Sequence, residues 1–302
     1  MLSEKLTRYV KMFILLFIAI PFFIFASSCV HKEAVQPPPK PAKIAVVLGA
    51  GASRGFAHIG VLKVLEANRV PIHMIVGTSA GSFVGSLYAY GLSAYEIQKI
   101  ALSIEKGDII DLMFPDNGFI AGEKLEEYVN TTLGNTPIEK LRTPFYAVAT
   151  NIQTGQEAVF FKGNTGKAVR ASCSIPGVFR PVRVADSMYV DGGTVSPVAV
   201  DAAKRYGADI VIAVDIAADR DTRQPEGTID TILQAINIMH AELSIKQLGK
   251  ADIIIRPRIG YIGASDFEKR HEAILEGEKA ASEALPAIQK IIENLRQEGR
   301  LD

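Results

Sequence analysis

Hydrophobic residues along most of this chain fall into short continuous runs that alternate with helix-spaced stretches. Five consecutive apolar residues at 44–48 have the length of a parallel strand buried on both faces. The glycine-rich stretch 49–55 follows, and residues 56–68 then carry apolar side chains at helical spacing. A second apolar run at 72–76 leads into small residues that continue to Tyr90. This order predicts strand, loop, helix, strand and helix.

The alternation continues to the C-terminus. Ser93 and Glu96 have the spacing of a capping box, which predicts a helix start. Further helices are expected at 122–133, 197–206, 228–248 and 267–298, and strands at 144–152, 158–161, 187–190, 209–215 and 252–256. Strands separated by helices predict an α/β fold, a three-layer α/β/α sandwich with a mostly parallel central sheet.

The first 28 residues have the pattern of an export segment. Lys5, Arg8 and Lys11 precede an uncharged apolar run from Met12 to Ala26, which is followed by two serines. A basic region, an apolar region and small residues at the end are typical of a secretory signal peptide. We therefore predict that residues 1–28 are removed from the mature protein.

Cys29 comes directly after these small residues and resembles the lipidated cysteine of bacterial lipoproteins. The resemblance implies that Cys29 becomes the first mature residue and carries a lipid anchor. The third position before the cysteine is usually leucine in such signals and is Ala26 here. By analogy with lipoprotein sorting, Val30 in place of aspartate predicts the outer membrane, facing the periplasm.

An uncleaved anchor is the alternative for this segment. Residues 12–30 contain no charge and approach the roughly 20 residues that span a bilayer, although Pro21 interrupts them. In both readings the rest of the chain is tethered at a membrane surface. We expect residues 29–43 to form an extended proline-rich linker and residues 44–302 to form one catalytic domain.

Composition excludes several classes of function. The chain has 302 residues with 33 basic and 33 acidic side chains, and removal of residues 1–28 leaves 30 basic and 32 acidic ones. A nucleic-acid-binding protein needs a basic surplus, so no nucleic-acid partner is expected. Two cysteines are too few for a disulfide framework or a four-thiolate zinc site, and we predict no metal and no cofactor.

Ser79 is the candidate nucleophile. It lies in Gly77-Thr78-Ser79-Ala80-Gly81, a G-x-S-x-G sequence between a predicted strand and a predicted helix. A sharp turn in this context exposes the serine hydroxyl, and the glycines leave room for the backbone. The positive end of the following helix points at any developing oxyanion.

The glycine-rich stretch 49–55 is a candidate anion-binding loop, because free backbone N–H groups gather between a buried strand and a helix. A dinucleotide site would need an acidic residue at the end of the next strand, and a Walker loop would need a lysine after the glycines. The sequence supplies neither, which disfavours a nucleotide-binding oxidoreductase. We therefore expect an oxyanion hole near Gly51 and Ala52.

A serine nucleophile requires a base. His240 and His271 follow Ser79 in the order of an α/β-hydrolase, but both lie in amphipathic helical stretches. The other option is a carboxylate acting alone, and Asp191 ends a predicted strand at a glycine pair. Composition does not distinguish Asp191 from other aspartates such as Asp186 and Asp215.

Three ordered motifs resemble the patatin-like phospholipase family: residues 49–55, residues 77–81 and Asp191-Gly192-Gly193. Residues 171–179, Ala-Ser-Cys-Ser-Ile-Pro-Gly-Val-Phe, resemble a further block of this family. The resemblance covers about residues 43–214. It implies a three-layer α/β fold and hydrolysis of acyl esters of phospholipids and other lipids without a metal.

The resemblance also assigns roles to residues. It implies that Ser79 is the nucleophile, that Asp191 is the base, and that the region of Gly51, Ala52 and Arg54 forms the oxyanion hole. The expected partners are a phospholipid or other acyl ester and, through the lipid on Cys29, the membrane surface. The alternative from another class is a catalytically silent lipoprotein that binds lipid or a partner protein.

Two further features leave alternatives open. Residues 109–120 are rich in large apolar side chains and form either a lipid-facing cap over the site or ordinary core packing. Cys173 is expected to be a buried thiol without a partner rather than a nucleophile.

Overall fold

The computed structural model describes residues 4–5, 7–11, 38–114, 117–217 and 224–301. It divides into two units, Met1–Pro39 and Lys40–Asp302. The described residues of the first unit before residue 12 are helical. The predicted apolar run, the cleavage site and Cys29 lie outside the described residues. Within the described ranges, no helix is long and apolar enough to cross a membrane.

The second unit is built on an eight-stranded sheet with the order β5-β6-β3-β2-β1-β7-β8, and β4 pairs with β3 beside this path. The strands β1, β2, β3, β7 and β8 run parallel, while β4, β5 and β6 join by antiparallel pairing. Their bounds are β1 Ile44–Leu48, β2 Met74–Thr78, β3 Phe145–Asn151, β4 Glu157–Phe160, β5 Val182–Val184, β6 Ser187–Asp191, β7 Ile210–Val214 and β8 Ile253–Ile255.

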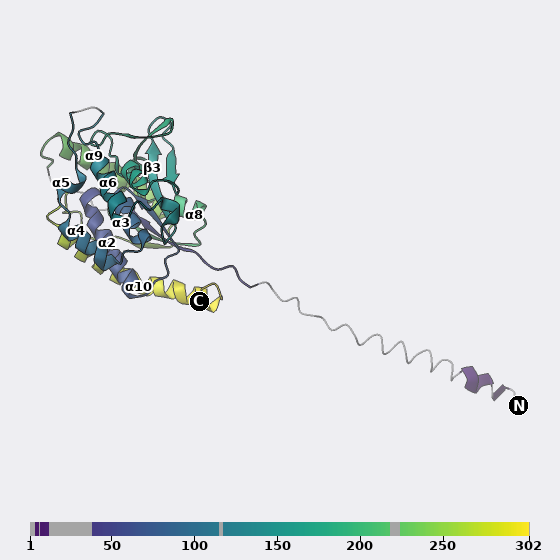
Figure 1. The fold of residues 1–302 in the computed structure, drawn as a ribbon. Helices are drawn as coiled ribbons and strands as arrows, with labels where there is room; N and C mark the ends of the chain where they lie inside the picture. Colours follow the sequence, from purple (N-terminus) through teal and green to yellow (C-terminus); the bar gives the residue numbers. More distant parts are fainter. Residues whose placement is uncertain (1–3, 6, 12–37, 115–116, 218–223, 302) are drawn as a thin grey trace. The chain divides into compact units, whose positions relative to one another are not determined.

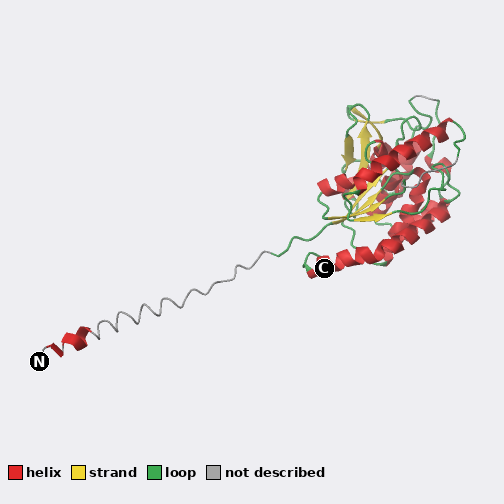
Figure 2. Ribbon diagram, turned by 180° about the vertical axis from the view of Figure 1, so that it is seen from behind, coloured by secondary structure: helices red, strands yellow, loops and turns green. Residues whose placement is uncertain are grey.

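Helices cover both faces of the sheet (Figures 1 and 2). The α-helices of this unit are α2 Phe56–Ala67, α3 Ala80–Tyr90, α4 Ala94–Ser103, α5 Lys106–Ile109, α6 Glu123–Thr132, α7 Thr165–Cys173, α8 Val200–Arg205, α9 Thr228–Leu248 and α10 Arg270–Gln297. Short 3₁₀ helices are η1 Ala52–Gly55, η2 Ile138–Lys140 and η3 Gly192–Thr194.

The central strand β1 shows why two helix layers are needed. Ile44, Val46 and Leu48 pack into a core with α2, α3, α4, α6 and α10, while Ala45 and Val47 pack into a second core with α8. Successive side chains of a strand point to opposite faces, so a continuously apolar strand must be covered on both. Full burial of each large aliphatic side chain contributes about 1.5–3 kcal/mol to folding. The predicted three-layer α/β/α fold is confirmed.

Two glycines bring α2 and α10 into backbone contact. A Cβ atom on Gly60 would lie 1.9 Å from the carbonyl oxygen of Ile274, and one on Gly277 would lie 2.0 Å from that of Ala57. No side chain fits at either position, because such distances are far below van der Waals contact. The crossing fixes α2 directly after the glycine-rich loop and so holds one wall of the site.

The predicted helices and strands are present in the structure with small shifts of their ends, and a few short elements were not predicted. Residues 228–248 are predicted and observed as one helix, and the capping box of Ser93 and Glu96 begins α4. Helices α5 and α7 and strand β5 were not predicted, because α5 and β5 have only four and three residues and α7 is short and polar. Ala42 is buried and donates to the carbonyl of Arg300 at 2.8 Å, so the compact unit includes the end of the predicted linker.

Candidate active site

Ser79 occupies a strained turn between β2 and α3. Its backbone has φ 54° and ψ −125°, a conformation that non-glycine residues adopt only where the surrounding structure enforces it. A Cβ atom on Gly77 would lie 2.5 Å from the Cα atom of Ser82, and one on Gly81 would lie 2.1 Å from the carbonyl oxygen of Leu48. Both glycines are therefore required for the chain to turn this sharply, as the G-x-S-x-G pattern predicts.

The structure brings Ser79 and Asp191 together. Ser79 Oγ donates a hydrogen bond to Asp191 Oδ2 at 2.5 Å, across 112 residues of sequence. The backbone N–H of Gly193 donates to the other carboxylate oxygen, Oδ1, at 2.7 Å. Both side chains are buried. The carboxylate is thus held at two points and directed at the serine hydroxyl.

Burial determines how Asp191 titrates. Desolvation raises the pKa of its carboxyl group from 3.8 to about 7, and the hydrogen bonds from Ser79 and Gly193 oppose this rise. A carboxylate with an ordinary pKa near 4 would be a poor acceptor for a serine proton, whereas one near 7 is matched to neutral pH. The arrangement therefore makes Asp191 competent as a general base.

The C-terminal part of α7 and the residue after it support both members of the pair. Ser172 Oγ accepts from the N–H of Ser79 at 2.9 Å and donates to the carbonyl of Val148 at 2.6 Å. The carbonyl of Ser174 accepts from the N–H of Asp191 at 2.8 Å. The sequence singled out the block 171–179. It did not predict that Ser172 would bond to Ser79 and Ser174 to Asp191.

The loop between β1 and α2 presents backbone donors. Within the described ranges, the N–H groups of Gly51 and Ala52 have no acceptor, whereas those of Gly49, Ala50 and Ser53 are bonded to carbonyls of neighbouring segments. Ala52 has φ 49° and lines the cavity in front of Ser79. Gly51 and Ala52 thus lie where an anion-binding loop was predicted, with their donors available.

Arg54 takes a different place from its two neighbours in the predicted oxyanion hole. Its side chain is fully buried, and its Nε donates to the carbonyl of Ile262 at 2.7 Å. Its backbone N–H donates to the carbonyl of Gly51 at 3.1 Å, and the Asn237 amide, with its oxygen toward the guanidinium, accepts at 2.7 Å. Arg54 therefore fixes the loop against α9 and the 260–262 segment.

Among the described residues, no histidine is hydrogen-bonded to Ser79. His58 is buried and hydrogen-bonded to the carbonyl of Gly49 at 2.8 Å, and burial lowers its pKa to about 4. His271 is exposed near the start of α10. His240 lies on α9 beside the aspartate loop, where a Cβ atom on Gly193 would be 2.4 Å from its Nε2. Burial lowers the pKa of His240 to about 4.

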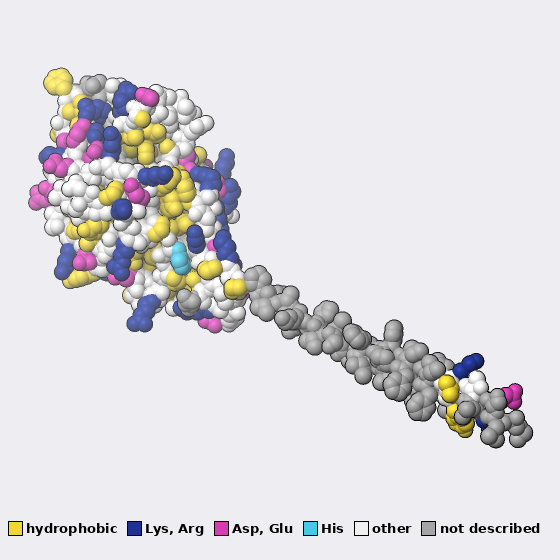
Figure 3. Space-filling view, turned by 45° about the vertical axis from the view of Figure 1, so that its right-hand side comes forward, with side chains coloured by type: hydrophobic (Ala, Val, Ile, Leu, Met, Phe, Trp, Pro, Cys, Tyr) yellow, Lys and Arg dark blue, Asp and Glu magenta, His cyan; other side chains and the backbone are white. Residues whose placement is uncertain are grey.

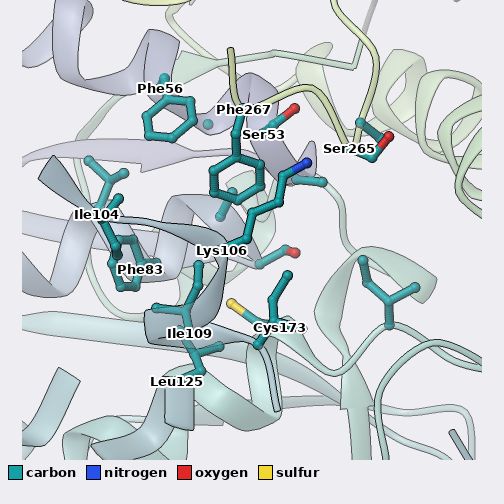
Figure 4. Close-up of a pocket in the computed structure, with 18 of the residues that line it drawn as sticks. Ser53, Phe56, Phe83, Ile104, Lys106, Ile109, Leu125, Cys173, Ser265 and Phe267 are labelled. Carbon is teal, nitrogen blue, oxygen red and sulfur yellow. The ribbon is translucent and has the colours of Figure 1, made fainter. Parts of the chain in front are cut away.

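A cavity of about 270 Å³ opens in front of Ser79 (Figure 4). Its wall is almost entirely hydrocarbon, contributed mainly by α2, α3, α4, residues 104–110, Ile120 and the segment 173–179. Cys173 also lines it, and desolvation raises the pKa of this thiol, with the neighbouring Asp191 carboxylate adding to the rise. A neutral thiol is a poor nucleophile, so Cys173 serves as cavity wall.

The described residues between 109 and 120 divide into packed and exposed side chains, and a lipid-facing cap stays a prediction. Ile109, Ile110 and Ile120 line the cavity, as packing residues would. Leu112 and Phe114 are 80% and 95% exposed, which is unusual for side chains of their size. Three isoleucines of this segment thus line the cavity, while Leu112 and Phe114 present apolar side chains to their surroundings.

Charge on the second unit is mixed, as basic and acidic side chains are interspersed over the face shown in Figure 3. Among the described residues, no group of three or more His, Cys, Asp and Glu side chains could hold a metal ion.

The curated relatives of this chain include very large proteins. Lysophospholipase NTE1 of Pyricularia oryzae is 32% identical over 236 residues, which are 75% of this chain and 16% of that protein. Lysophospholipase nte1 of Aspergillus niger is 36% identical over 191 residues, which are 61% of this chain and 12% of that protein. The chain therefore spans about a sixth or less of the length of these relatives.

A solved structure and a family profile complete the comparison. VipD from Legionella pneumophila has a similar fold, with a TM-score of 0.55 at 12% identity over 82% of this chain and 67% of that one. The profile described as patatin-like phospholipase matches residues 46–204, which is more than half of the chain and contains both Ser79 and Asp191. The sequence match and the fold agree, and the chain belongs to the patatin-like phospholipase family.

Proposed function

We propose that this protein is a serine lipid acyl hydrolase that cleaves the carboxylic esters of phospholipids, with Ser79 as nucleophile and Asp191 as the base. The observation that carries the proposal is the 2.5 Å hydrogen bond from Ser79 to Asp191. It joins a serine in a strained strand-to-helix turn to a carboxylate with a raised pKa, at the wall of an apolar cavity. Membership of the patatin-like family supports lipid hydrolysis.

In the proposed acylation step, Ser79 Oγ attacks the ester carbonyl carbon as Asp191 Oδ2 takes the hydroxyl proton. The carbonyl oxygen becomes an oxyanion that the N–H groups of Gly51 and Ala52 stabilise, an effect worth about 3–4 kcal/mol for a donor of this kind. The carbon–oxygen bond to the alcohol then breaks, and the leaving alcohol takes the proton from Asp191. The product of this half-reaction is an acyl-Ser79 ester.

In the proposed deacylation step, a water molecule replaces the alcohol. Asp191 takes its proton as the water oxygen attacks the acyl carbon, and the same N–H groups stabilise the second oxyanion. The bond to Ser79 Oγ breaks, Asp191 returns the proton to Ser79, and a fatty acid leaves. The cycle is complete without a metal or cofactor, since every proton moves between Asp191, Ser79 and the substrates.

The cavity supports a substrate with one acyl chain in the site. Its volume of about 270 Å³ is slightly below the range of typical ligand pockets, about 300–1,000 Å³. Each methylene group transferred into such a wall contributes roughly 0.8 kcal/mol to binding. A single chain fits this space better than two, which agrees with the lysophospholipase names of the relatives. We therefore propose lysophospholipids as the preferred substrates.

The test is hydrolysis of a 1-acyl lysophospholipid by the purified protein, with fatty acid and glycerophosphodiester as expected products. Because Asp191 must be ionised to act as a base and its pKa is raised to about 7, kcat/KM should rise about tenfold per pH unit below 7 and level off above it. A stopped assay at pH 5 to 9 measures this profile. If kcat/KM instead levelled off already above about pH 4, the base would be His240, whose pKa is lowered to about 4.

We also propose that the catalytic unit is tethered by a lipid on Cys29 to the bacterial outer membrane, facing the periplasm. The support is the sequence of residues 1–28 and the cysteine that follows them. Cells grown with labelled palmitate should incorporate label into the wild-type protein and not into Cys29→Ser. Label retained in Cys29→Ser would contradict the lipoprotein assignment.

A further inference from the structure

Lys106 differs from everything else that lines the cavity. It begins α5 and is the one charged side chain among the described residues that form the wall. The remaining wall is hydrocarbon apart from Cys173 and three serines, at positions 53, 79 and 265. Figure 4 shows the lysine side chain beside the Phe267 ring, with its amine directed to the side where Ser53 and Ser265 lie.

The fold makes little use of the Lys106 charge. Its Nζ lies over the face of the Phe267 ring, 5.4 Å from the ring centroid. Such a contact contributes only about 0.5–1 kcal/mol at an exposed site. Among the described residues no carboxylate lies within 4.0 Å of this amine, and the neighbouring Asp108 instead accepts from the N–H of Glu105 at 2.8 Å.

Two nearby cations show what a structural role looks like in this region. Lys124 Nζ donates to the carbonyl of Gly107 at 2.7 Å and so anchors α5. Arg270 Nη1 donates to the carbonyls of Ala101 and Ile104, each at 2.9 Å, and so closes the end of α4. Lys106 makes no comparable bond in the described chain, and its hydrogen-bond donors remain directed to solvent and the cavity.

An apolar cavity with one cation at its wall matches an amphiphile with one anionic group. An acyl chain would occupy the hydrocarbon part, and the ester would lie at Ser79. The headgroup belongs to the alcohol part of the ester, and the exposed Lys106 amine is the cation that the described cavity wall offers to it. A phosphate there would accept charge-assisted hydrogen bonds, which are about twice as strong as neutral ones.

We propose that Lys106 forms a headgroup subsite that binds the phosphate of a single-chain phospholipid and so favours phosphate-bearing esters over neutral glycerides. The inference rests on the proposed function, because it requires Ser79 to cleave acyl esters. It makes Lys106 a specificity-determining residue outside the Ser79–Asp191 pair. The chemistry of the acyl transfer is the same for both substrate classes, so only the preference depends on this lysine.

The test compares two monomeric substrates with the same chain, 1-octanoyl-lysophosphatidylglycerol and 1-octanoylglycerol, both used below their critical micelle concentrations. Lys106→Met keeps the apolar length of the side chain and removes the charge. We expect kcat/KM for the phosphate ester to fall about three- to fivefold, mainly through KM, because an exposed charge pair contributes up to about 1 kcal/mol. The value for 1-octanoylglycerol should remain within about twofold.

Lys99→Met is the matched control, because Lys99 is an exposed lysine on α4 that also stacks on a ring, Tyr95, but lies outside the cavity wall. This variant should behave like the wild type, and Lys106→Arg should retain most of the phosphate preference. The expected loss should also shrink at high salt, as screening weakens the interaction of exposed charges.

Three outcomes would overturn the subsite. The first is an equal loss on both substrates in Lys106→Met, which would mark a structural role for α5. The second is no change on either substrate. The third is an unchanged preference together with weaker inhibition by octanoate, which would assign the lysine to the fatty acid carboxylate. If the wild type cleaves neither ester, the proposed function fails, and that result differs from all three.

Discussion

Replacing Ser79 with alanine is expected to reduce ester hydrolysis by about 10⁴- to 10⁶-fold, to the background of the assay. The substitution removes the oxygen that forms the acyl-enzyme and leaves the backbone turn, the cavity and Asp191 in place. The remaining site can bind substrate but has no group that can carry the acyl chain. Release of fatty acid from a lysophospholipid measures the loss, and a fluorophosphonate probe should label the wild type and not Ser79→Ala.

Ser86→Ala provides the control for this variant. Ser86 is also fully buried on α3, seven residues further along, and its hydroxyl donates to the carbonyl of Phe83 at 2.8 Å. Ser86→Ala removes the same hydroxyl oxygen from the helix that follows Ser79 and should leave both labelling and hydrolysis close to wild type. Probe labelling that persists in Ser79→Ala would disprove the nucleophile assignment. A folded wild-type protein that the probe does not label would favour a silent lipid-binding protein.

The fold could be predicted because its signals are local and repeated. Each parallel strand is a short apolar run, and each long helix carries a periodic face, so β1 and α9 were found at their observed bounds. The short polar α7 has no such signal, since its position follows from bonds to Ser79 and to β3 rather than from its own periodicity. Tertiary contacts formed by single hydroxyl groups leave little pattern in a sequence.

Only those parts of the candidate site that belong to sequence motifs could be predicted. The spacing around Ser79 indicates a strained turn, and the glycine pair after Asp191 indicates a close backbone approach. Neither shows that the two residues meet, because 112 residues separate them. Arg54 belongs to the loop motif, yet burial turns its side chain toward α9. Lys106 lies in no motif, and only the folded chain places it at the cavity.

Asp191→Asn is expected to lower kcat by about 10²- to 10⁴-fold, the range that a positioned general base contributes. Asparagine keeps the size of the side chain, and its carbonyl oxygen can still accept from the N–H of Gly193. Its amide cannot take the proton of Ser79, so attack on the ester loses its base. Steady-state hydrolysis at pH 8 measures the effect, and Asp186→Asn, on the exposed turn before β6, is the control that should retain activity.

The stability of Asp191→Asn shows whether the variant loses activity because it lacks the base or because it is unfolded. The folded-state pKa of Asp191 is raised to about 7, so the folded protein keeps this proton at a pH where the unfolded chain has released it. The unfolding free energy of the wild type therefore falls as pH rises from about 4 to 7, and that of Asp191→Asn lacks this contribution. The Tm of the variant relative to wild type should increase over this range and remain constant above it.

Both measurements together decide between Asp191 and His240. His240 packs against Gly193, close enough to the aspartate loop to be the alternative base, and burial lowers its pKa to about 4. If His240 were the base, Asp191→Asn would retain activity, and His240→Phe would lose it. If Asp191 is the base, Asp191→Asn loses activity while its Tm at pH 8 is at least that of wild type. Asp191 would then be a buried carboxylate that lowers the stability of the fold and is needed for activity because it accepts the Ser79 proton.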